Sequence, residues 1–284
     1  MTIYIQLQSK KMVTALLPSL LYLLLLLAAS STGYAASLKL GVVPQQSASK
    51  LAQLWSPIAE YISNATGETI HFATAPDIPT FEKRLAAGEY DIAYMNPYHF
   101  VVFNANPGYH AIVRARDNPI RGIMVARKDS KIYNLKDLDG AKLAFPAPAA
   151  FAASILTRAE LASLGIQFQP VYVSSHDSVY RSVAKGFFPA GGGVIRTYNN
   201  VDPSIRKQLK ILWISNEFTS HAIATHPMMD NNLSKKIQKA FAVMDRDETG
   251  RKLLQGIALK GFEIAEDRDW DDVRSLKLDL LSDL

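Results

Sequence analysis

The order of the expected elements predicts an α/β protein built from two units. Short apolar runs such as residues 38–43, which end at Pro44, are typical of strands buried on both faces. They alternate with segments of helical periodicity such as residues 49–67, whose end is marked by Gly67. This alternation starts again after about residue 110. Alternating strands and helices with short links predict two mostly parallel sheets, each flanked by helices.

Each element follows from its own stretch of sequence. In the first unit we expect strands at 69–74 and 91–95 after the one at 38–43, with helices at 49–67, 80–90 and 96–105. In the second we expect extended runs at 110–115 and 122–128, a helical turn and strand within 134–146, a helix from Pro148, a strand at 170–175 and a helix at 177–186. Two more strands follow at 211–215 and 221–226, and the tail from Asn232 reads as helical.

The restart of the pattern predicts that the chain passes between two lobes. The segments near 114–122 and 214–223 are the candidate crossings. Two crossings make the first lobe discontinuous, with residues 36–118 and 218–284 in lobe 1 and residues 119–217 in lobe 2. A ligand is then expected in the cleft, where strand ends and helix N-termini meet.

The N-terminus has the order of a secretory signal. Lys10 and Lys11 precede a long apolar run, and small residues follow it, so residues 1–35 are predicted to be cleaved after Ala35. The alternative is an uncleaved membrane anchor, which Pro18 disfavours because it interrupts the run. The chain contains 0 cysteines and so lacks the residue that carries the lipid of a bacterial lipoprotein. We therefore expect a protein free in the periplasm.

Composition excludes several classes of function. Residues 1–35 hold two lysines and no acidic residue, which leaves 29 basic and 26 acidic side chains and a net charge of +3. Neither that charge nor any basic cluster indicates nucleic-acid binding. The six histidines show no metal-ligand spacing, no phosphate-binding or dinucleotide loop is present, and a consecutive His-Asp-Ser cannot form a catalytic relay. We expect neither an enzyme nor a cofactor or metal site.

Five stretches carry a family resemblance. They are "LGVVP", Trp55 with "SPIAEYI", "YDIAYMNPYHFVV", "NLKDLDGAKLAFPAP" and "SSHDSVYRSVAKG". In order and spacing the chain resembles, from about residue 38 to 245, the PhnD-like phosphate, phosphite and phosphonate-binding proteins of bacterial ABC importers. The resemblance implies a type II periplasmic binding protein: two lobes on a two-strand hinge that close on a small solute. It also implies a monomer that delivers its ligand to an ABC permease or, alternatively, presents it to a sensor histidine kinase.

The chain departs from that family where the anion should be held. Family members carry serine or threonine hydroxyls at the helix start after the "LAF" strand, whereas this chain has Ala150, Phe151 and Ala152. Backbone N–H groups at a helix start can still hold an anionic oxygen. We therefore expect a site that is more apolar than a phosphonate site and that binds phosphate and simple alkylphosphonates poorly.

The "MNPYHF" turn supplies a first group of candidate ligand residues. Asn96 and the proline after it are the residues that cap and open a helix, and this role explains both. The other interpretation adds ligand binding, with Tyr94, Tyr98 and His99 facing the cleft. Both interpretations remain open from sequence alone.

A second group lies in the second unit. His176 matches a family position that faces the ligand, and Asp177 is either a helix-dipole acid or the group that raises the pKa of that histidine. Gly192, in a run of three glycines, is either part of a tight turn or a place where the backbone approaches the ligand. Arg196 offers a permanent planar cation for a carboxylate or oxyanion.

Overall fold

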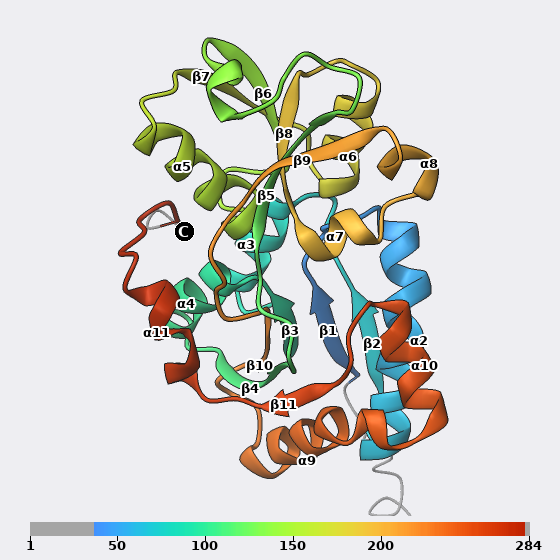
Figure 1. The fold of residues 1–284 in the computed structure, drawn as a ribbon. Coiled ribbons are helices and arrows are strands. Elements are labelled where there is room, and N and C mark those ends of the chain that lie inside the picture. Colours follow the sequence, from blue (N-terminus) through green and yellow to red (C-terminus); the bar gives the residue numbers. More distant parts are fainter. Residues whose placement is uncertain (1–36, 282–284) are drawn as a thin grey trace, which may run out of the picture. The chain divides into compact units, whose positions relative to one another are not determined.

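Two β-sheets organise residues 37–281, the part of the chain that this computed structural model describes (Figure 1). The predicted signal sequence lies outside these residues. None of the helices in the described part is both long and apolar enough to span a membrane. The α/β class expected from the sequence is confirmed, and each sheet mixes parallel and antiparallel pairs.

The first sheet has the strand order β11-β4-β10-β3-β1-β2. Its strands are β1 (Leu38–Val42), β2 (Ile70–Ala73), β3 (Ile92–Met95), β4 (His110–Ala115), β10 (Ala222–Thr225) and β11 (Phe262–Ile264). β1, β2 and β3 pair in parallel, whereas β10 and β11 run against their neighbours. The sequence pattern missed β11, which is only three residues long.

The second sheet has the order β7-β6-β8-β5-β9. Its strands are β5 (Gly122–Arg127), β6 (Ala141–Phe145), β7 (Phe168–Tyr172), β8 (Ala190–Val194) and β9 (Leu209–Ile214). β6 pairs in parallel with β7 and β8, and β5 runs antiparallel to β8 and β9. One direction therefore dominates in this sheet, with a single reversed strand among those described.

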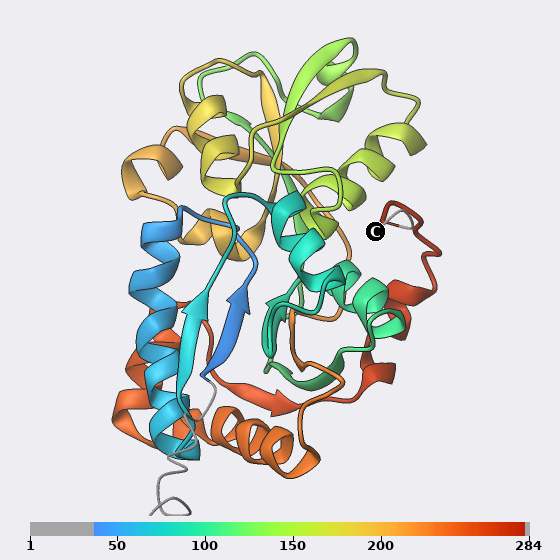
Figure 2. The same cartoon turned by 180° about the vertical axis from the view of Figure 1, so that it is seen from behind.

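Helices cover both sheets, as Figures 1 and 2 show from opposite sides. Around the first sheet lie α2 (Ala48–Thr66), α3 (Ile78–Ala86), α4 (Pro97–Ala105), α9 (Asn231–Ala242), α10 (Glu248–Gly256) and α11 (Asp271–Arg274), with short turns η3 (Met244–Arg246) and η4 (Asp267–Trp270). Around the second lie η1 (Leu135–Leu138), η2 (Phe151–Leu156), α5 (Thr157–Ser163), α6 (His176–Ala184), α7 (Ile195–Asn199) and α8 (Pro203–Arg206). α2 shows how the sequence sets its bounds: the Ser47 hydroxyl accepts from Lys50 N, and Gly67 ends the helix at φ 71°.

The chain passes between the sheets twice, after β4 and after β9. The two connecting segments pair with each other through Ile120 and Phe218. Each backbone nitrogen donates to the other residue's carbonyl oxygen, at 2.8 Å from Ile120 and 3.0 Å from Phe218. Both residues lie within the predicted crossings, 114–122 and 214–223. We call this antiparallel pair the hinge.

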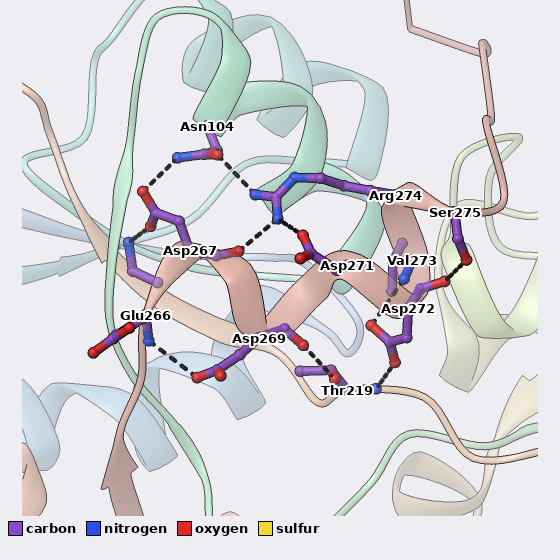
Figure 3. A network of polar contacts seen from close by, with 11 residues as sticks. Asn104, Thr219, Glu266, Asp267, Asp269, Asp271, Asp272, Val273, Arg274 and Ser275 are labelled. Atoms are coloured by element: carbon purple, nitrogen blue, oxygen red, sulfur yellow. Dashed lines mark hydrogen bonds and ion pairs between the residues drawn. The ribbon is translucent and has the colours of Figure 1, made fainter.

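The C-terminal segment braces the second connecting segment (Figure 3). The carboxylate of Asp272 accepts from Thr219 N at 2.7 Å, and the Thr219 hydroxyl donates to Asp269 O at 2.8 Å. The Trp270 indole donates to Ser220 O at 2.9 Å. Three hydrogen bonds from residues 269–272 therefore fix the backbone next to the hinge.

The glycine run forms neither a turn nor a ligand-facing loop. It lies inside strand β8, paired with β5. A Cβ on Gly192 would lie 1.9 Å from Ala153 O, and one on Gly122 would lie 2.2 Å from Ala152 O. These two glycines allow the backbone of η2 to lie directly on the second sheet. The backbone at Gly192 is closely approached, as expected, but the group that approaches it is η2 of the same chain and not a ligand.

Candidate ligand-binding cleft

The methyl-rich helix start is packed by the protein itself. η2 is a turn of π-helix that continues into α5, and Ala150 at its N-cap provides no side-chain hydrogen bond. Phe151 is 1% exposed and contacts Phe218 of the hinge edge to face, with 5.4 Å between ring centroids. Ala150, Ala152 and Phe151 belong to the same hydrophobic cluster as the core of the first sheet. One apolar core therefore extends from η2 into the first sheet.

This packing leaves almost no room at the helix start. The cavity lined by Asn96, residues 150–153 and His176 has a volume of about 10 Å³. That is about the space needed for one water molecule. In this structure a phosphate or phosphonate group therefore does not fit where η2 begins.

The "MNPYHF" turn is mainly structural. The Asn96 side chain caps α4 by accepting from His99 N at 2.8 Å, and its amide donates to Ala149 O of the second unit at 3.3 Å. Tyr98 and His99 do not reach the cleft, contrary to expectation. The Tyr98 hydroxyl accepts from Leu280 N at 2.7 Å, and the His99 imidazole lies 2.8 Å from the buried Glu82 carboxylate. Both side chains lie on faces of α4 that pack against the elements around the first sheet.

Gln45, which the sequence analysis did not select, connects the two halves of the cleft. Its backbone oxygen accepts from His176 N at 3.1 Å. Its side-chain oxygen accepts from Arg196 Nη2 at 2.7 Å, and its amide nitrogen lies 3.0 Å from His221 Nε2. Gln45 directly follows the predicted first strand and Pro44. A polar side chain at a strand's carboxyl end was therefore the signal that could have identified it.

Two of the candidate residues, Arg196 and Tyr94, lie close together and line the same cavity. The Arg196 guanidinium is 5.8 Å from the centre of the Tyr94 ring, and Nη1 is 3.5 Å from Ile257 O. Tyr94 stacks on His221 with 5.0 Å between ring centroids. Among residues 37–281, Arg196 forms no ion pair with a carboxylate. It is therefore a cation still able to receive an anion.

Of the two roles left open for Asp177, the structure disfavours the one in which it raises the pKa of His176. Burial, with a smaller contribution from the positive charge of Arg196, lowers the pKa of His176 to about 3. His221 is also buried, and burial and Arg196 lower its pKa well below the usual value. Asp177 is not among the groups that shift the pKa of His176. Burial raises the pKa of the Asp177 carboxyl itself, and the charges of Lys50 and Arg181 partly oppose that rise. The cleft histidines are therefore neutral at pH 7.

This burial predicts a pH-dependent stability. Above pH 6.5 His176 is neutral in both the folded and the unfolded chain. Between pH 6.5 and about 3, only the unfolded chain binds a proton at this residue. Between pH 7 and pH 5 the free energy of unfolding should fall by about 2 kcal/mol for this residue. Urea unfolding of wild type and His176→Gln at both pH values measures the difference. The exposed His71 provides the control substitution His71→Gln. If the free energy of unfolding changed equally between pH 7 and pH 5 in all three proteins, a buried neutral His176 would be contradicted.

A larger cavity lies beside the hinge, and we call it the hinge cavity. Its volume is about 330 Å³. Both connecting segments and both sheets contribute to its wall, which includes Tyr94, Ile120, Arg121, Arg196, Glu217 and His221. The cavity is within the size range of small-molecule sites. Among the described residues no cluster of side chains suits a metal ion.

Comparison with known families identifies the protein class. The family described as the ABC transporter, phosphonate, periplasmic substrate-binding protein matches residues 40–270. The chain belongs to this family. The phosphonate-binding family consists of periplasmic transport components that bind substrate. This membership supports the importer role over the sensor-kinase alternative.

Individual relatives agree with the family assignment. The phosphate-import protein PhnD of Mycolicibacterium smegmatis is 23% identical, with 86% of each chain covered. Among solved structures, PhnD1 from Prochlorococcus marinus in complex with methylphosphonate has a TM-score of 0.78 at 16% identity, covering 84% of this chain and 96% of that one. A binding protein of a Pseudomonas aeruginosa ABC phosphonate transporter also has a TM-score of 0.78, at 17% identity and 85% coverage of both chains. At these identities the structures show a shared fold.

Proposed function

We propose that this protein is the periplasmic receptor of an ABC importer and that it holds a small anion between its two sheets through Arg196. The observation that carries the proposal is the position of this guanidinium. It lies in the cleft next to Tyr94 and Gln45 and has no carboxylate partner among the described residues. A partly buried cation of this kind favours an anionic partner, since an anion taken out of water needs a compensating charge.

The predicted lobes give this site its mechanism. Lobe 1 would comprise residues 36–118 and 218–284, and lobe 2 residues 119–217, with the hinge between them. Lys50 Nζ donates to Asn200 O at 2.9 Å, and Gln45 contacts Arg196 and His176, so contacts from both lobes meet across the cleft. A ligand anion that Arg196 holds while keeping its contact with Gln45 would add a further link between the lobes and so favour the closed form that the permease recognises.

Export and oligomeric state belong to the same proposal. Cleavage after Ala35 would release a chain with no cysteine for lipid attachment into the periplasm. A monomer suits this role because a single closed receptor presents both lobes to the permease.

The ATPase activity of the permease complex tests the proposed function. The permease and ATPase of the same transport operon, reconstituted in proteoliposomes, should hydrolyse ATP faster when the mature chain is added. The control is the same chain after heat denaturation. An unchanged rate, together with binding to the periplasmic domain of a sensor histidine kinase, would favour the alternative role.

A further inference from the structure

The charges around the hinge cavity leave one cation without a counterion. Arg121 and Glu217 both line the cavity and form an ion pair with each other. Arg196 lines the same cavity, and among the described residues no carboxylate pairs with it. The charged side chains of the cavity wall therefore sum to one positive charge.

The histidine in the wall adds a donor without adding charge. The Gln45 side-chain oxygen accepts from Arg196, so the other end of the amide is the NH2 group, which can only donate. His221 Nε2 is therefore the acceptor of the hydrogen bond from Gln45. The ring of His221 is neutral and carries its proton on Nδ1, which leaves Nδ1–H as its only ring donor.

The rest of the wall carries no charge: part of it is hydrocarbon, and Asn118, Asn199 and Ser220 add neutral polar groups. Pro119, Ile120, Val194 and Ile195 line the cavity together with the stacked rings of Tyr94 and His221. A phosphonate or phosphate dianion would bring three oxygens and up to two negative charges to this wall. A single planar guanidinium instead matches the two oxygens and one charge of a carboxylate.

We propose that the hinge cavity binds a small monocarboxylate, with its carboxylate on Arg196 and its hydrocarbon body against Ile120 and Tyr94. This inference rests on the proposed function and specifies its ligand class. The site differs from the helix start at η2, where the available volume is about 10 Å³.

Calorimetry on the mature chain tests the inference with acetate, butyrate, benzoate, inorganic phosphate and methylphosphonate. We expect at least one of the three monocarboxylates to bind at least about tenfold tighter than phosphate and methylphosphonate. Arg196→Ala should weaken that binding at least about 100-fold, and Arg196→Lys should weaken it at least about tenfold because lysine lacks the planar fork. Arg158→Ala, which removes another partly buried arginine, should leave the affinity unchanged; circular dichroism checks that each variant is folded.

A second variant tests the charge count. Glu217→Gln releases Arg121 from its ion pair and gives the wall a second unpaired cation. The affinity for methylphosphonate should then rise relative to that for the best monocarboxylate. Equal effects on both ligands would overturn the charge argument.

The failures of the two proposals can be told apart. Tighter binding of phosphate or methylphosphonate, no binding of any monocarboxylate, or binding unaffected by Arg196→Ala would each overturn the monocarboxylate inference. The role as an importer receptor would still stand if the mature chain stimulates the permease ATPase. Loss of that stimulation overturns the function independently of the ligand.

Discussion

Phe151→Ala is expected to lower the free energy of unfolding by about 3–5 kcal/mol, the range for removing a fully buried aromatic ring. The ring is 1% exposed and contacts Phe218, and it lies in a cluster shared by η2 and the first sheet. Its loss removes apolar contacts on both sides of the cleft at once. Urea unfolding followed by circular dichroism measures the change.

A second phenylalanine in the same lobe provides the control. Phe187 is 71% exposed, so Phe187→Ala should change stability by no more than about 0.5 kcal/mol. If Phe151→Ala costs less than about 1 kcal/mol, η2 and the first sheet do not share the core described above. Phe151 would then be free to act as the ligand-facing wall that the sequence first indicated.

Gly192→Ala is expected to destabilise the protein by about 3 kcal/mol or more, at the upper end of the effect of overpacking a core. The added Cβ would lie 1.9 Å from Ala153 O and 2.8 Å from the Phe145 ring. A backbone oxygen cannot move aside as a flexible side chain can, so β8 and η2 would have to separate. Thermal and urea unfolding of the purified variant provide the measurement.

Gly256→Ala is the control for Gly192→Ala, because it adds the same methyl group at a glycine where that group clashes with nothing. A Cβ there has its nearest neighbour, Leu54 Cδ2, at 3.5 Å, which is an ordinary contact. Its stability should stay within about 1 kcal/mol of wild type. A Gly192→Ala protein as stable as this control would show that η2 does not lie against β8 as described.

The local pattern of the sequence was sufficient for most of the α/β elements and for the family, although it missed strands β8 and β11. Apolar runs, helix caps and glycine stops such as Gly67 act over a few residues, so they can be read without knowing the fold. The crossings near 114–122 and 214–223 followed from the restart of that pattern, and the structure has its hinge within them. Tyr94 was selected because an amphipathic ring at a strand end is typical of a cleft, and Arg196 because it is a permanent planar cation that follows the glycine run.

Only the tertiary structure decided what each candidate side chain faces. His99 and Tyr98 are adjacent to Asn96 in sequence, yet α4 directs them to Glu82 and Leu280 inside the first lobe. The charge of His176 depends on its burial and on its distance from Arg196, which is 20 positions away in the chain. Neither the burial nor that distance can be read from the local sequence. By sequence, Gly192 was either part of a turn or a place where the backbone approaches a ligand. Its position in strand β8 under η2 follows from packing between distant segments. Sequence therefore determines which groups are present, and the burial and partners that set their chemistry arise when distant segments meet.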